Sequence, residues 1–173
     1  EVGRETAWVD LLAEPSTLEG NTDFGNGVGG EADDQSFRII LDYRLDTRLG
    51  MKEPERRALR AAAAVWERHI ASRFPKVPAG TELRLPDPQD VDNTSFELAV
   101  DYAIRDVVVF PATCVIDGEG NTLAGSGGGF ANVANLALRK ELHERYAGAR
   151  HEPWSASMCF DRAEPFFVDP APD

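Results

Sequence analysis

The feature that most constrains the fold is a continuous apolar run, Val107–Phe110, within the segment Arg105–Ala112. An apolar run of strand length predicts a central β-strand that is buried on both faces of a sheet. With 173 residues, the chain is long enough to form one domain with a core of that size.

Strand-like and helix-like patterns alternate around this run. Apolar residues recur at every second position in Phe37–Tyr43, which predicts a strand. Glu53-Pro54-Glu55 opens a long helix, because proline and acidic residues favour a first helical turn, and Phe74-Pro75 ends it. The other expected elements are strands at Glu82–Leu85, Thr122–Gly125 and Ser155–Asp161, a short helix or irregular cover at Phe96–Tyr102, and a helix at about Asn132–Tyr146.

The long helix carries one apolar stripe at helical spacing, which predicts a face packed on the sheet. The stripe consists of Ala58, Leu59, Ala62, Val65, Trp66, His69 and Ile70. Because His69 lies on this stripe, we interpret it as a partly buried structural histidine and not as a metal ligand.

This order of elements predicts an α+β fold with a mixed, mostly parallel twisted sheet. The sheet has an edge hairpin strand, one long crossover helix and a second inserted helix. Residues 1–36 are rich in glycine and acidic residues and predict a flexible N-terminal arm, with an α/β subdomain over residues 37–173. A phosphate cradle in the glycines of the arm is disfavoured, because no strand precedes them, no helix follows and no lysine is near.

The formal net charge of −12, from 30 acidic and 18 basic residues, repels phosphate backbones and argues against a nucleic-acid partner. The longest apolar runs are too short to span a bilayer, so no membrane span is predicted. The chain begins at Glu1 and not at Met, either because a leader has been removed or because the sequence was trimmed. We expect a secreted or extracellular protein.

Two cysteines, Cys114 and Cys159, each lie beside a strand-like run. An even number of cysteines in a processed chain permits a disulfide between them. Two buried free thiols that pack as small apolar groups are the alternative.

No complete catalytic motif is present in the sequence. His143-Glu144 resembles the start of an HExxH zinc helix, but the second histidine position holds Ala147, and His151 is too far along the chain to share the helix face. Gly125-Ser126-Gly127 does not match a G-x-S-x-G nucleophile elbow. We therefore expect no catalytic residues in this chain.

The turn Asp117-Gly118-Glu119-Gly120-Asn121-Thr122 has a composition that suits calcium. A tight glycine turn can direct carbonyl groups and a carboxylate inward, and calcium prefers six to eight such oxygens. An ordinary hairpin turn is the alternative, since Asp-Gly is a common turn dipeptide.

Taken together, five segments resemble the first half of a metzincin zinc metalloprotease domain of the matrixin branch. The resemblance covers roughly Phe37 to Asp169, and the order and spacing of the segments are more specific than any one of them. The segments are F-R-I-I-L-D-Y for the first strand, A-A-A-A-V-W-E-R-H-I for the first helix, R-D-V-V-V-F for the third strand, D-G-E-G-N-T-L-A for the loop entering the substrate-flanking edge strand, and S-A-S-M-C-F-D-R-A-E for the fifth strand.

The resemblance implies a metzincin-like upper subdomain with a structural calcium and an edge strand that flanks the substrate. The edge strand maps to Thr122, Leu123, Ala124 and Gly125. The calcium ligands map to Asp117, the carbonyls of Gly118, Gly120 and Thr122, and the carboxylates of Asp161 and Glu164. Gly125 and Cys159 stand where the family's structural zinc needs histidines, so that zinc site is not expected.

In the family, the catalytic HExxHxxGxxH helix follows the fifth strand, and the sequence through Asp173 contains none of it. The resemblance therefore implies the N-terminal, substrate-flanking portion of a secreted matrixin-like zinc endopeptidase, which is not catalytic by itself. Catalytic zinc is expected only if a C-terminal remainder supplies HExxH, and the partner is then a peptide substrate. The alternative is a non-enzymatic extracellular structural or binding module that assembles with a protein partner through its edge strand and is stabilised by calcium.

Overall fold

A computed structural model of the chain describes residues 36–71, 74, 76–90, 95–117, 122–128, 130–131, 136–147 and 153–163. The predicted arm, residues 1–36, lies outside the described residues except for Ser36. The elements in chain order are β1 (Ile39–Leu41), α1 (Glu53–His69), β2 (Glu82–Pro86), β3 (Ser95–Ala99), β4 (Val107–Cys114), β5 (Ala124–Gly128), β6 (Phe130–Ala131), α2 (Leu136–Ala147) and β7 (Ser155–Asp161).

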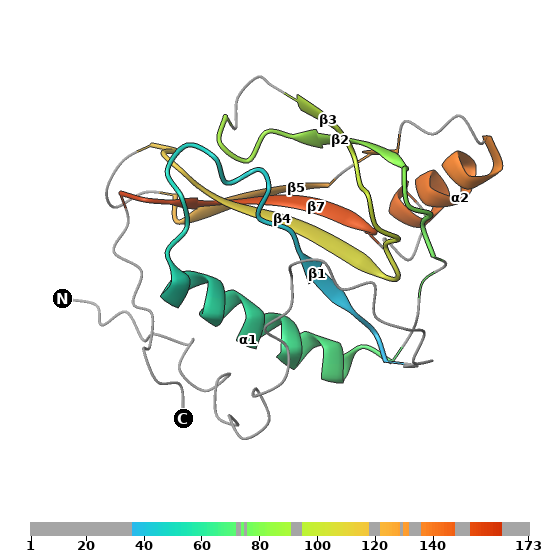
Figure 1. The fold of residues 1–173 in the computed structure, drawn as a ribbon, viewed down its shortest axis with the longest axis horizontal. Helices are drawn as coiled ribbons and strands as arrows, with labels where there is room; N and C mark the ends of the chain where they lie inside the picture. The colour runs from blue at the N-terminus through green and yellow to red at the C-terminus, as the bar shows by residue number, and fades with distance from the viewer. Residues whose placement is uncertain are drawn as a thin grey trace.

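Two sheets and two helices build the described part of the chain (Figure 1). The larger sheet has the strand order β1-β4-β7-β5, in which β1, β4 and β7 are parallel and β5 is antiparallel to β7. Helix α1 lies on one side of this sheet, and the smaller sheet lies on the other side (Figure 1). The prediction of an α+β fold with a mixed, mostly parallel sheet is confirmed.

The smaller, antiparallel sheet has the order β3-β2-β6 and was not predicted. The segment Phe96–Tyr102 was expected as a short helix or irregular cover, and its first residues instead belong to strand β3. Leu98 pairs with Leu83 and Phe96 pairs with Leu85 of β2. These cross-strand apolar pairs explain why the segment is extended, because a strand is stabilised by the neighbour it pairs with.

Strand β4 lies between β1 and β7, as its apolar sequence predicts. Its residues Val108 and Phe110 have no exposed surface and face the smaller sheet, where Leu83 and Leu85 of β2 are equally buried. The main core therefore lies between the two sheets. Its buried members are Leu45, Val77, Leu83, Leu85, Val100, Ile104, Val108, Phe110, Leu142 and Trp154.

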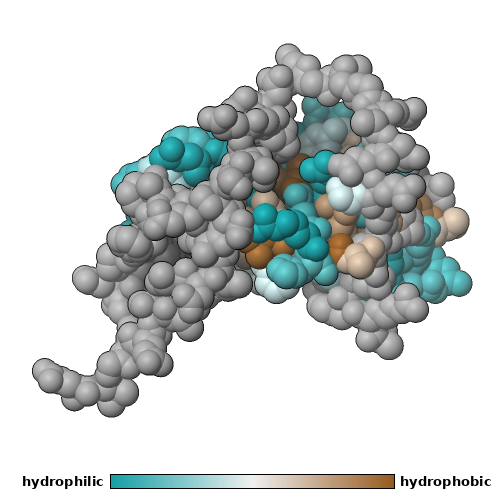
Figure 2. All heavy atoms as spheres, turned by 90° about the horizontal axis from the view of Figure 1, so that it is seen from below, coloured by the Kyte–Doolittle hydropathy of each residue, from teal (hydrophilic) through white to brown (hydrophobic). Residues whose placement is uncertain are grey.

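Among the described residues, the sheet face that carries α1 is covered less completely than the opposite face. Val107 and Val109 of β4 point to this side and are only partly buried. Seen from below, the side on which α1 lies in Figure 1, the surface has apolar residues at its centre between hydrophilic ones (Figure 2). One helix is narrower than a four-stranded sheet, so it shields only part of this face.

Helix α1 contains no fully buried residue, and five residues of the predicted apolar stripe are partly buried while Trp66 and His69 are exposed. Trp66 is 60% exposed, and His69 is exposed as well, so the interpretation of His69 as a partly buried histidine is wrong. The helix packs at the β1 margin of the sheet, which leaves the flank carrying these two residues in solvent. It ends at His69, before the predicted Phe74-Pro75, because Ile70 takes an extended backbone conformation.

The outer margin of β1 is protected by α1. The backbone N–H of Ile39 points away from β4 and donates to the Glu67 carboxylate at 2.7 Å. An exposed strand edge offers unpaired donors and acceptors to other chains, and a covering side chain removes one of them. One outward donor at this margin of the larger sheet is therefore capped by the protein itself.

Neither helix of the described segments combines the length and the apolar character that crossing a membrane requires.

Candidate functional site

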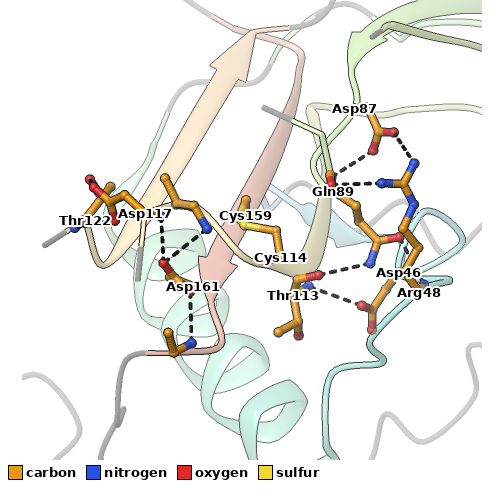
Figure 3. Close-up of a disulfide and its surroundings, with 12 residues drawn as sticks. Asp46, Arg48, Asp87, Gln89, Thr113, Cys114, Asp117, Thr122, Cys159 and Asp161 are labelled. Atoms are coloured by element: carbon orange, nitrogen blue, oxygen red, sulfur yellow. Dashed lines mark hydrogen bonds and ion pairs between the residues drawn. A yellow bond between two sulfur atoms is a disulfide. The ribbon is translucent and has the colours of Figure 1, made fainter. Parts of the chain in front are cut away.

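Strands β1, β4 and β7 run in the same direction, so their carboxyl ends lie together at one end of the larger sheet. Ligands of open parallel sheets bind outside the carboxyl ends of the strands. The predicted residues Cys114, Asp117, Thr122, Cys159 and Asp161 all come from the ends of β4 and β7 or from the turn before β5 (Figure 3). We refer to these five residues as the carboxyl-end cluster.

Cys114 and Cys159 are joined by a disulfide, with their Cα atoms 5.7 Å apart. Cys159 is the register partner of Ala112, and Cys114 is the partner of Asp161, so the two cysteines are diagonal neighbours on one face. Both are buried. The disulfide links β4 to β7 close to the point where both strands end.

Asp161 is the buried centre of the cluster, with no exposed surface. Its Oδ2 accepts hydrogen bonds from the backbone N–H of Ile116 at 3.1 Å and of Asp117 at 3.4 Å. Its Oδ1 accepts from the N–H of Ala163 at 2.9 Å. The carboxylate therefore ties the turn after β4 to the end of β7.

Asp117 connects this turn to the start of β5. Its Oδ1 accepts from the backbone N–H of Thr122 at 3.0 Å, and its Oδ2 accepts from the Thr122 hydroxyl at 2.7 Å. Asp117, Thr122 and Asp161 are thus brought into one hydrogen-bonded chain, as Figure 3 shows. The other three predicted calcium ligands, Gly118, Gly120 and Glu164, lie outside the described residues.

Over the described ranges, no three or more side chains of His, Cys, Asp and Glu are grouped so that they could hold a metal ion. The carboxylates of Asp117 and Asp161 accept hydrogen bonds from the protein. Calcium therefore stays a prediction that a direct titration has to test.

The predicted edge strand, Thr122–Gly125, is observed as β5, which begins at Ala124 and continues to Gly128. Thr122 and Leu123 precede it. The carbonyl of Leu123 accepts from the N–H of Asp161 at 2.9 Å, and Leu123 lies opposite Asp161 when the register of β5 and β7 is extended by one residue.

This hydrogen bond fixes which backbone groups of β5 face outward. Hydrogen-bonded and non-hydrogen-bonded pairs alternate along an antiparallel ladder. Leu123, Gly125 and Gly127 therefore bond to β7, and the N–H and C=O groups of Ala124 and Ser126 point away from it. In the part of the chain that the structure describes, β5 pairs only with β7, and the side chains of Ala124 and Ser126 are exposed.

A second polar network beside the cluster was missed by sequence reasoning (Figure 3). Asp46 Oδ1 accepts from the N–H of Thr113 at 3.2 Å, and its Oδ2 accepts from the N–H of Met51. Gln89 donates from Nε2 to the carbonyl of Thr113 at 3.0 Å. Asp46 and Thr113 are 67 residues apart, and no local pattern announces such a pair. The network holds two loops against the end of β4.

Asp42, directly after β1, anchors a third group of polar residues at the carboxyl end of the sheet. Tyr102 donates from its hydroxyl to Asp42 Oδ2 at 2.6 Å, and burial together with this hydrogen bond raises the pKa of Tyr102. Arg44 pairs with Asp42 at 2.8 Å and with Asp101 at 2.9 Å, and its hydrogen bond lowers the pKa of Asp101. The phenol stays protonated at neutral pH and acts here as a donor.

Comparisons with protein-family models, with curated proteins and with solved structures find no match to this chain.

The role of Asp161 can be tested by its amide analogue. In Asp161→Asn, an NH2 group replaces one acceptor oxygen and meets a backbone N–H, so one buried donor loses its partner. We expect the free energy of unfolding in urea to fall by about 1–3 kcal/mol. Glu97→Gln on exposed β3 is the matched control and should change it by less than about 0.5 kcal/mol. Equal effects of the two changes would contradict the anchoring role.

Proposed function

We propose that the chain is the N-terminal, substrate-flanking portion of a secreted matrixin-like zinc endopeptidase, and that an extended peptide binds along β5. The chain is not catalytic by itself, and catalytic zinc enters the proposal only with a C-terminal part that supplies HExxH. The chain's own residues bind and orient the peptide backbone.

The arrangement of the strands supports this proposal. The segments that resemble the first, third, fifth and edge strands of the family correspond to β1, β4, β7 and β5. All four belong to one sheet, and the edge strand lies at its margin in the antiparallel direction. Helix α1, which resembles the family's first helix, lies against the same sheet (Figure 1).

The observation that carries the proposal is the open edge of β5. Ala124 and Ser126 direct backbone donors and acceptors outward, and no described residue pairs with them. The opposite edge, at β1, differs because Glu67 caps the N–H of Ile39. An extended peptide adds to an open edge by forming main-chain hydrogen bonds with it.

A non-enzymatic extracellular binding or structural module is the second candidate. The observation that favours it is exposed apolar surface near the carboxyl ends of the strands: Val115 is 66% exposed and Leu123 is 55% exposed. Surface of this kind suits a protein partner that assembles through the same edge strand. An HExxH motif encoded soon after Asp173 favours the endopeptidase, and its absence from the natural coding sequence favours the module.

Peptide binding at β5 is tested with a fluorescein-labelled octapeptide of threonine, valine and lysine. Ser126→Pro removes an outward N–H that β7 does not use, so the fold should tolerate it at an edge strand. We expect fluorescence anisotropy to show binding to the unaltered chain and at least about tenfold weaker binding to Ser126→Pro. Ser126→Ala keeps the N–H and should bind as the unaltered chain does. Equal binding by all three chains would place the peptide elsewhere.

Calcium belongs to the same proposal, with Asp117, Thr122 and Asp161 as described ligands and Gly118, Gly120 and Glu164 as the remaining ones. A site with a dissociation constant near 10⁻⁴ M gives about 2 kcal/mol of stabilisation at 5 mM calcium. We expect the melting temperature to rise by about 4–8 °C in 5 mM calcium. Magnesium should give a smaller shift, and Asp161→Asn should abolish it. An unchanged melting temperature in calcium contradicts the site.

A further inference from the structure

We infer that the peptide bound along β5 carries a large apolar side chain, aromatic or branched, which occupies the open position in front of Gly125. This inference rests on the proposed function and names the class of peptide that the edge selects.

Residues Leu123, Gly125 and Gly127 alternate with outward-bonding neighbours and share one face of the larger sheet. Gly125 is the register partner of Cys159, so this is the face that carries the buried disulfide. It is also the face toward the smaller sheet, because Gly127 approaches Pro86 of β2.

The two glycines on this face have different surroundings. A Cβ atom added to Gly127 would lie 2.8 Å from Pro86 Cγ, so β2 closes the space there. A Cβ atom added to Gly125 meets nothing within 4 Å. Gly125 is not among the described glycines with a positive φ, which are Gly50 and Gly80. Neither backbone conformation nor packing against the described residues requires a glycine at position 125, and its missing side chain leaves space.

The apolar groups beside this space are Leu123 and the disulfide, while Ser157 and Asp161 flank Cys159 on the same face of β7 and are buried. Leu123 lies two residues before Gly125 on the same face and is 55% exposed, so its side chain can contact an apolar group placed over Gly125. The Cys114–Cys159 disulfide lies on the same face of β7. A large side chain on a neighbouring strand packs over a glycine opposite it, and aromatic residues do so best.

The charge of the chain adds a second requirement on the peptide. The formal net charge is −12, so a peptide with basic residues beside the apolar one is attracted and an acidic one is repelled. The predicted ligand is therefore an extended, basic segment with one large apolar residue placed over Gly125.

The experiment compares two labelled octapeptides of threonine and lysine that differ at one central position, phenylalanine or alanine. We expect the phenylalanine peptide to bind the unaltered chain at least about tenfold more tightly than the alanine peptide, because binding removes the apolar surface of its side chain from water. In Gly125→Leu, the leucine fills the space, and this preference should fall to about twofold or less. Ser126→Leu adds the same bulk on the other face and should keep the preference.

The outcomes distinguish a failure of the side-chain inference from a failure of the proposed function. If both peptides bind with equal affinity to the unaltered chain, the side-chain inference is wrong and edge binding stands. If neither peptide binds, the proposed function fails and the inference falls with it. Circular dichroism verifies that each variant is folded. Should Gly125→Leu be unfolded, the smaller Gly125→Val is the substitute, with Ser126→Val as its control and the same expected loss of preference.

Discussion

The pairing of β7 with β4 on one side and with β5 on the other determines where the cysteines, Asp161 and strand β5 lie. The parallel pairing brings the carboxyl ends of β4 and β7 to the same end of the sheet. The antiparallel pairing makes β5 the outer strand. Two buried links hold this arrangement, the Cys114–Cys159 disulfide and the Asp161 carboxylate. If β7 were shifted by one residue, its polar face and its disulfide cysteine would turn to the opposite side.

Among the described residues, the two margins of the larger sheet differ. The outward N–H of Ile39 on β1 meets Glu67 of α1, because the helix packs at that margin. Strand β5 lies at the other margin, where its alternation with β7 leaves Ala124 and Ser126 with outward backbone groups. Two hydrogen bonds join Asp117 to Thr122 just before β5, and the pairing with β7 sets the direction and register of the strand. A strand margin that no described residue pairs with suits recognition of an extended chain.

Patterns that depend on neighbours in sequence could be interpreted correctly. The apolar run Val107–Phe110 predicts central strand β4, and the predicted bounds of Ser155–Asp161 agree with those of β7. Features that depend on distant partners could not. Strand β3 exists because it pairs with β2, and the Asp46–Thr113 hydrogen bond joins segments 67 residues apart. The exposure of Trp66 has the same origin, because helical spacing identifies a stripe but not how much of a sheet one helix covers.

Amide hydrogen exchange in β5, followed by NMR, tests the open edge most directly. The account predicts alternation in the free protein: the amides of Gly125 and Gly127, which bond to β7, exchange slowly, and those of Ala124 and Ser126 exchange at least about a hundredfold faster. Adding a bound peptide should slow the fast pair selectively. Equal, strong protection of all four amides in the free protein would show that another part of the chain already covers this edge, and would contradict the account.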